Sequence, residues 1–172
     1  MKSENPNVSK QLSEIQQDLL TLTDSSRSKA SSSSIVEEPG VGYVSFFANR
    51  MAIIQVIQNG LPFSLFEKIK NISPFSEMEW ADFLGVSSKT LQRQKKEANF
   101  SFKPIQSEKI LELAEVVNLG LSAFDTSEQF YSWLKEPSFA LGKMKPIDLI
   151  RDSYGKELVM DELNRIEFGI FA

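Results

Sequence analysis

Residues 76–96 read SEMEWADFLGVSSKTLQRQKK, and this stretch decides the fold of the middle of the chain. Ser76 followed by Glu79 is a capping box, which predicts that a helix begins there. Gly85 interrupts the helical pattern with a residue that accepts a left-handed turn, and Ser87 can cap a second helix. Two short helices joined by such a turn predict a helix-turn-helix.

The second helix of this motif begins the most basic part of the chain. Between residues 88 and 103 there are five basic side chains and one acidic side chain. Leu91 is expected to anchor the helix in the core, which leaves its polar neighbours for solvent or the major groove of DNA. Glutamine and arginine side chains can read base edges, whereas lysines suit phosphates. The candidate DNA-binding residues are Ser88, Lys89, Thr90, Gln92, Arg93, Lys95, Lys96 and Lys103. A merely solvated basic surface is the alternative that this motif leaves open.

Helical patterns continue on the N-terminal side of the motif, and no segment shows the sustained alternation that is typical of a strand. We expect one helix in which Ile53, Ile54 and Ile57 share a face, ended by Asn59 and Gly60. Pro62 is expected to open the next helix. Helices that follow one another through short loops predict an all-α fold.

A long helix is predicted after the basic patch, beginning near Pro104. Its apolar stripe consists of Ile110, Leu113, Ala114, Val117 and Leu121. Core packing is one role for this stripe, and a share in a homodimer interface is the alternative.

The last 50 residues carry several signals for the starts and ends of helices. Thr126 is expected to cap a helix that Pro137 ends, and Pro146 to open a short one that Gly155 ends. A final helix then carries Val159, Leu163 and Ile166. Beyond its predicted end at Gly169 lie Ile170 and Phe171, two large apolar residues that point to docking on this domain or on a partner.

Residues 1–40 are predicted to be a flexible tail. A run of serines between residues 25 and 34 has too little apolar surface to offset the entropy of ordering. Before it, five apolar residues from Val8 to Leu22 recur at spacings of four and three, which predicts a short amphipathic helix. The domain boundaries that we expect are therefore 1–40, 41–123 for the helix-turn-helix domain and 124–172 for a C-terminal domain.

Composition excludes several classes of function. The chain of 172 residues has no Cys and no His, so zinc–thiolate sites, disulfides, thiol nucleophiles and histidine bases are ruled out. No apolar run approaches the roughly 20 residues of a membrane span. The formal net charge is −4, yet residues 41–123 carry nine basic and eight acidic side chains and form the only segment with a positive balance.

Four blocks near the end of the chain resemble the C-terminal toxin-binding domain of the MbcA/ParS/Xre antitoxins. That domain runs W-L-x-x-P, A-L-G-G, P-x-D-L-L and L-x-R-I-E-x-G-x-F-A. The corresponding residues are 133–137 (WLKEP), 140–142 (ALG), 146–150 (PIDLI) and 163–172 (LNRIEFGIFA). Lys143 replaces the second glycine of A-L-G-G, which places a side chain where the turn favours glycine.

Residues 84–93 (LGVSSKTLQR) are similar to the Xre-type helix-turn-helix of the same antitoxins, which often reads S-x-x-T-L-x-R-R. Gln94 stands at the second arginine, so the resemblance predicts that one contact with DNA is missing.

The resemblance implies an antitoxin whose C-terminal domain blocks the active-site entrance of a RES-type toxin that destroys NAD⁺. It also implies homodimers that bind operator DNA and repress their own operon in the bacterial cytoplasm, with no membrane partner. The expected toxin-binding residues are Arg165, Glu167, Phe168, Ile170 and Phe171. Arginine and aromatic side chains are the usual anchors of protein interfaces. On this interpretation the chain has no catalytic residue, metal or cofactor.

Two other functions stay open. The chain could be a helix-turn-helix regulator with a different protein partner and no RES toxin. It could also be an enzyme that uses Asp148, Asp152 and Tyr154, although solvated carboxylates and a core tyrosine explain these residues more simply.

Overall fold

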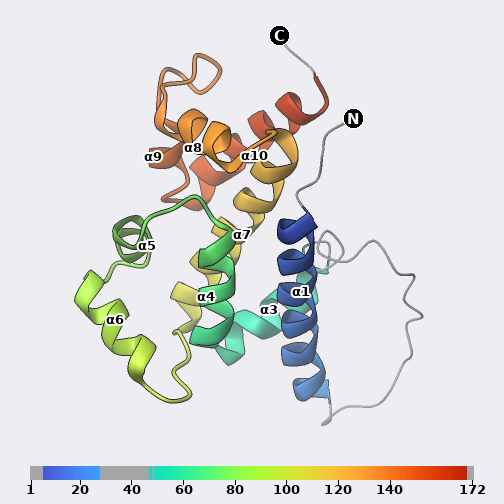
Figure 1. Cartoon of the computed structure of the whole chain (residues 1–172), viewed down its shortest axis with the longest axis vertical. Coiled ribbons are helices and arrows are strands. Elements are labelled where there is room, and N and C mark those ends of the chain that lie inside the picture. Colours follow the sequence, from blue (N-terminus) through green and yellow to red (C-terminus); the bar gives the residue numbers. More distant parts are fainter. Residues whose placement is uncertain (1–5, 28–46, 48, 170–172) are drawn as a thin grey trace. The chain divides into compact units, whose positions relative to one another are not determined.

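The computed structural model describes residues 6–27, 47 and 49–169, and within these ranges the chain forms helices and no β-strand (Figure 1). The helices are α1 (Pro6–Arg27), α3 (Arg50–Asn59), α4 (Phe63–Ile72), α5 (Glu77–Phe83), α6 (Ser88–Lys96), α7 (Pro104–Ala123), α8 (Ser127–Lys135), α9 (Pro146–Leu149) and α10 (Ser153–Glu167). The predicted all-α fold is confirmed. The serine run from residue 28, Ile170 and Phe171 lie outside the described residues.

Several helix ends follow the local signals of the sequence. Ser76 and Glu79 form the complete capping box at the start of α5, and the Thr126 side chain accepts a hydrogen bond from a backbone N–H of α8. Gly60 ends α3 with φ +83°, a conformation that favours glycine. Pro146 is the first residue of α9, where its missing N–H costs no helical hydrogen bond.

The prediction for Gly155 was wrong. It does not end a helix but lies in the first turn of α10, where its N–H donates to the Asp152 cap at 2.8 Å. A Cβ at this position would lie 2.2 Å from the Leu149 carbonyl oxygen. Glycine is therefore required because the backbone that follows α9 passes too close for any side chain.

The described residues divide into two compact units. The first unit holds residues 6–27, 47, 49–72 and 93–108, and the second holds residues 73–92 and 109–169. In the first unit α1 packs on α3 and α4, with Ile15 and Leu19 fully buried (Figure 1). Lys68 of α4 donates to Asp18 of α1 at 2.6 Å. The heptad pattern near the N-terminus thus forms a helix that packs on its own unit.

The buried face of α3 does not coincide with the face that the three isoleucines share. Ala52 and Val56 are its buried residues, whereas Ile54 is 43% exposed. The three isoleucines have helical spacing, but α1 packs on α3, and the side chains that become buried are those of Ala52 and Val56. Helical periodicity identifies a helix without deciding which of two apolar sides becomes core.

A phenylalanine cluster holds the segment after α6 against the start of α4. The rings of Phe66 and Phe102 meet edge to face at 5.1 Å, and Phe63 stacks on Phe102 at 5.7 Å. The buried Ser107 hydroxyl accepts from the Leu61 N–H at 2.9 Å and donates to the Phe102 carbonyl at 3.2 Å. These contacts fix the backbone that follows α6 within the first unit.

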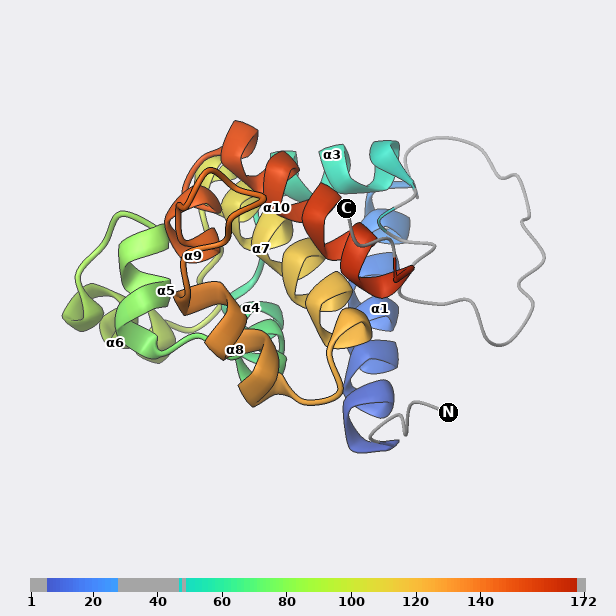
Figure 2. The ribbon, with the colours of Figure 1, turned by 90° about the horizontal axis from the view of Figure 1, so that it is seen from above.

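In the second unit α8, α9 and α10 gather beside the C-terminal part of α7 (Figure 2). Its fully buried side chains include Trp80, Leu113, Val117, Phe130, Leu134, Ile150, Val159 and Leu163. The α7–α10 contact also has a polar seam. The Ser153 hydroxyl donates to Glu112 at 2.7 Å, and Lys156 pairs with Glu115. No helix among the described residues is long and apolar enough to cross a membrane.

Candidate functional site

The α5–turn–α6 segment has the geometry that the sequence predicted for a helix-turn-helix. Gly85 adopts φ +64°, and the Val86 N–H donates back to the Ala81 carbonyl at 2.9 Å. Ala81 and Leu91 are 3% and 2% exposed, so α5 and α6 are anchored by small and apolar groups. The Ser87 hydroxyl accepts from the Thr90 N–H at 3.1 Å and caps α6.

One face of α6 presents polar side chains to solvent. Lys89, Gln92, Arg93 and Lys96 are all exposed and recur at spacings of three, one and three, which places them along one side of the helix. Ser88 and Thr90 are half-buried, and the Thr90 hydroxyl is hydrogen-bonded to that of Ser87 at 2.9 Å. The first four side chains therefore have the exposure that contact with a DNA groove requires.

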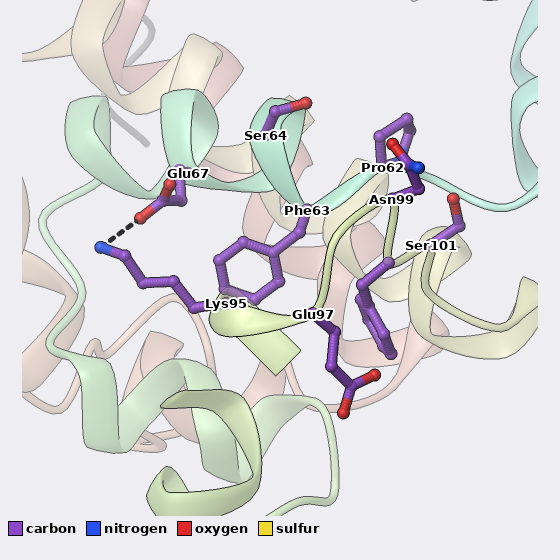
Figure 3. A pocket seen from close by; sticks show the side chains of 9 residues that line it. Pro62, Phe63, Ser64, Glu67, Lys95, Glu97, Asn99 and Ser101 are labelled. Carbon is purple, nitrogen blue, oxygen red and sulfur yellow. Dashed lines mark ion pairs between the residues drawn. The ribbon is translucent and has the colours of Figure 1, made fainter. Parts of the chain in front are cut away.

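The cations of this region differ in their partners. Lys95 pairs with Glu67 at 2.6 Å, and Figure 3 shows the two side chains pointing toward each other. Arg93 lies 3.6 Å from Glu97, which is a looser contact. The remaining predicted lysines of the patch, which are Lys89, Lys96 and Lys103, are exposed and form no ion pair with a described residue. These three lysines are the ones with their charge available to phosphates.

A pocket of about 480 Å³ lies beside the Glu67–Lys95 pair within the first unit (Figure 3). Its lining residues are Pro62, Phe63, Ser64, Glu67, Lys95, Glu97, Asn99, Phe100 and Ser101. Two carboxylates on its wall oppose the binding of an anion such as a DNA phosphate.

Gln94 lies on the inward side of α6. It is 9% exposed, and its Oε1 is buried without a hydrogen-bond partner among the described residues. The position at which this sequence departs from the second arginine therefore faces protein rather than solvent. The departure removes no side chain from the exposed face of α6.

The outer face of α10 is a second candidate surface. Tyr154, Leu158, Asp161, Arg165 and Phe168 are all exposed and recur at spacings of four and three, which places them in one stripe. Tyr154, Leu158 and Phe168 are 86%, 54% and 72% exposed. These five residues form the outer α10 stripe. Large apolar groups at both ends and charges between them are typical of a protein interface.

A loop of the second unit adds exposed apolar groups. Phe139 is 86% and Met144 51% exposed, and an isolated bridge between Ser138 and Met144 closes the loop. Lys143 adopts φ +63° next to Gly142 at +66°. The turn thus keeps its left-handed shape although lysine replaces glycine, which costs roughly 1–2 kcal/mol.

Two of the predicted toxin-binding residues, Arg165 and Phe168, belong to the outer α10 stripe. Arg165 is exposed and donates to Glu162 at 3.2 Å, Phe168 is exposed, and Glu167 is half-buried. Sequence reasoning missed four exposed apolar residues, namely Phe139, Met144, Tyr154 and Leu158. Tyr154 and Leu158 do not fall at the helical spacing of the core residues Val159, Leu163 and Ile166. An apolar residue outside that spacing was the signal in the sequence that could have identified these two positions.

The Glu79 carboxylate of α5 is held by several donors. It accepts from the Ser76 backbone and hydroxyl at 2.8 and 2.9 Å, from the Tyr131 hydroxyl at 3.0 Å, and from Lys135 in an ion pair. Burial acts to raise the pKa of Glu79, but hydrogen bonds from Lys135, Ser76 and Tyr131 outweigh it and hold the pKa below its usual value. The hydrogen bond to Glu79 raises the pKa of Lys135 against the opposing effect of burial. Both groups are therefore charged across the neutral range.

A second contact of α5 involves Arg151, which follows α9. It pairs with Asp82 at 2.5 Å and lies over the Phe83 ring at 5.7 Å. Together with Glu79, it ties the first helix of the helix-turn-helix to the C-terminal helices within the second unit.

The residues of the alternative enzymatic site have structural contacts or lie in solvent. Asp152 caps α10, and Asp148 lies 3.9 Å from Arg151. Tyr154 is exposed, so the interpretation of it as a core tyrosine was wrong. The described residues contain no group of three or more carboxylates that could hold a metal ion.

Comparison with known proteins gives two adjacent domain matches. Residues 52–115 match the antitoxin Xre-like helix-turn-helix domain, and residues 120–169 match the antitoxin Xre/MbcA/ParS C-terminal toxin-binding domain. A curated relative from Sphingobium sp. (strain YBL2), named Prs ADP-ribosylating antitoxin, is 34% identical over 100 residues. That match covers 52% of this chain and 63% of the relative's length.

A solved structure supports the same fold. The crystal structure of the M. tuberculosis MbcT–MbcA toxin–antitoxin complex contains a chain that matches with a TM-score of 0.51 and 19% identity. The match covers 62% of this chain and 94% of that one. Both domain matches lie in order along the sequence, so the chain is similar over residues 52–115 and 120–169 to the two domains of the Xre/MbcA/ParS antitoxins.

Proposed function

We propose that this chain is an antitoxin that binds and inhibits a cognate RES-type, NAD-degrading toxin and represses its own operon by binding DNA. The observation that carries the proposal is the outer α10 stripe. It leaves three large apolar side chains in solvent within the segment that matches a toxin-binding domain. Exposed apolar groups in one stripe have no benefit for solubility and mark a surface for a partner.

On the toxin side, the chain acts by occupying a surface and does no chemistry. Tyr154 and Phe168 supply aromatic anchors at the two ends of the stripe, and Arg165 supplies a charge between them. Glu167, Ile170 and Phe171 extend the proposed contact toward the end of the sequence. A helix held in this way excludes substrate sterically.

The names of the relatives point to the chemistry of the partner. One relative is named for an ADP-ribosylating system, and the solved structure is a complex of the toxin MbcT with the antitoxin MbcA. ADP-ribosylation takes ADP-ribose from NAD⁺, so a toxin that consumes NAD⁺ agrees with the RES-type partner proposed for this chain.

On the DNA side, the exposed face of α6 enters the major groove, and the free lysines neutralise phosphates. Among the described residues, Lys89, Lys96 and Lys103 have no ion pair to lose when they meet DNA. We assign operator binding to a homodimer, because two copies of one reading helix suit a repeated site. The proposed domains are residues 41–123 for DNA and 124–172 for toxin, and the proposed location is the bacterial cytoplasm.

The test uses the full chain and the product of the neighbouring gene. The purified RES toxin is incubated with NAD⁺, and the loss of NAD⁺ is followed as the chain is added. We expect the loss to stop at a fixed molar ratio of the two proteins. Continued loss of NAD⁺ at a large excess of the chain would leave a helix-turn-helix regulator with a different partner as the better description.

A further inference from the structure

The side chain of Gln92 is oriented by a residue of another helix. Its Nε2 donates to Oε1 of Glu77, the first residue of α5, at 2.9 Å. Both residues belong to the second unit. On the exposed face of α6, Gln92 is therefore the uncharged side chain whose position is fixed by a hydrogen bond that it donates to a different helix.

An ionised carboxylate can only accept hydrogen bonds, and this decides which way the amide of Gln92 points. The amide nitrogen must face Glu77, so its oxygen is turned away from that carboxylate. Glu77 uses one N–H of the amide. We take this to be the N–H on the far side from the carbonyl oxygen, which leaves the second N–H beside that oxygen. The free edge of the amide thus offers one donor and one acceptor side by side.

That edge is the complement of adenine in the major groove. Adenine presents the N7 acceptor next to the N6 amino donor, and a glutamine amide can bond both at once. Guanine presents two acceptors, which a single N–H next to an oxygen cannot satisfy. An amide free to rotate by half a turn would lose this selectivity, because its donor and acceptor would exchange places.

We propose that Gln92 reads an A·T base pair in the operator and that Glu77 is the positioning residue that holds the amide in the reading orientation. This inference rests on the proposed DNA binding and adds the base that is read and the residue that sets the preference. Glu77 contributes no attraction to DNA, since its negative charge opposes the phosphates. Its effect is on discrimination between bases rather than on affinity.

The test is a selection of binding sites from DNA duplexes with a randomised central window, followed by gel shifts on the enriched site at fixed salt. The full chain is compared with Gln92→Ala and Glu77→Ala. A matched control is Glu128→Ala, because Glu128 is also a carboxylate in the first turn of a helix, α8, but is exposed and has no hydrogen bond or ion pair among the described residues.

We expect the full chain to enrich a motif with one strongly preferred A·T pair. A bidentate amide–adenine pair discriminates roughly 5- to 150-fold against a wrong base. Gln92→Ala should lose the preference at that position alone. Glu77→Ala should relax the same position while binding to non-specific DNA stays equal or becomes tighter, and Glu128→Ala should keep the motif. Thermal melts confirm that each variant is folded.

Two results would overturn the inference while leaving DNA binding intact. One is a motif that Gln92→Ala leaves unchanged at every position. The other is a Glu77→Ala protein whose binding falls evenly on all sites, which is the signature of a structural role. A full chain that enriches no motif would remove the proposed repressor function and this inference with it.

Discussion

Lys135 of α8 forms an ion pair with Glu79 of α5, and the two residues lie in different domain matches of the chain. Glu79 belongs to the segment that matches the helix-turn-helix domain, and Lys135 to the segment that matches the C-terminal domain. Both nevertheless lie in the second unit, together with Tyr131, which donates to the same carboxylate. The capping carboxylate of the helix-turn-helix is thus also a structural contact of the C-terminal helices.

Replacing Glu79 with Gln removes this charge and keeps an amide that can still cap α5. We expect the free energy of unfolding at pH 7 to fall by about 1 kcal/mol, because the pair is partly exposed. The pKa of Glu79 is lowered in the folded chain, so its contribution is complete above the unfolded pKa and is lost as pH falls through the folded value.

Urea unfolding between about pH 3 and pH 7 measures this effect, since unfolded Glu has a pKa near 4.3. The difference in free energy of unfolding between the parent chain and Glu79→Gln should shrink in acid. At the alkaline end the raised pKa of Lys135 makes its contribution complete below the unfolded pKa and lost only as pH rises through the folded value. A difference in stability that does not change with acid would refute the charge-based explanation.

Tyr154→Ala and Phe168→Ala should each weaken binding of the toxin by about 2 kcal/mol or more, as expected for aromatic anchors. Because the two side chains are 86% and 72% exposed, the melting temperature of the free chain should hardly change. Calorimetric titration with the toxin, beside thermal melts, separates these effects. Ile105→Ala is the control, since Ile105 is 76% exposed on α7, outside the outer α10 stripe. Parallel losses of stability and affinity would assign the two aromatic residues to the core.

Lys96→Ala and Lys95→Ala should differ in their effect on the salt dependence of DNA binding, although the two lysines are neighbours on α6. Lys96 has no ion pair among the described residues, whereas Lys95 pairs with Glu67 at 2.6 Å. Loss of Lys96 should lower operator affinity and reduce the slope of log affinity against log salt by about 0.9. Loss of Lys95 should change that slope less. Equal slopes for the two variants would mean that DNA displaces Glu67 from Lys95.

Ile15→Ala should destabilise the first unit by about 2–5 kcal/mol, because the side chain is fully buried on α1. Gln17→Ala, an exposed position two residues further along the same helix, should stay within about 0.5 kcal/mol of the parent. Hydrogen exchange of α4 amides reports the change where α1 packs. If Ile15→Ala left the stability of the first unit unchanged, α1 would not be held on α3 and α4 in solution.

Lys143→Gly should raise the free energy of unfolding by up to about 1 kcal/mol, since glycine accepts the φ of +63° at this position without strain. Lys145→Gly is the matched control. Its φ is −79°, so glycine there only increases the freedom of the unfolded chain and should destabilise by about 0.5–1 kcal/mol. We expect thermal melts to show a higher melting temperature for Lys143→Gly and a lower one for Lys145→Gly. A change in the same direction for both variants would rule out backbone strain as the cause.

The sequence by itself determined the features that depend on neighbours within one helical turn. The Ser76–Glu79 capping box, the left-handed turn at Gly85 and the start of α9 at Pro146 were all predicted and are present. Each depends on a hydrogen bond or a backbone angle set within four residues. The all-α class followed from these local signals together with helical periodicity.

Only the tertiary structure decided which surfaces are covered and which side chains from distant helices meet. Ile54 has the periodicity of a core residue and is exposed, and Tyr154 was taken for core and lies in solvent. Gln92 and Glu77 are 15 residues apart, and Glu79 and Lys135 are 56 apart, so no local pattern predicts either contact. Burial and orientation depend on the faces that other helices occupy, and that information is spread over the whole chain rather than held in one turn.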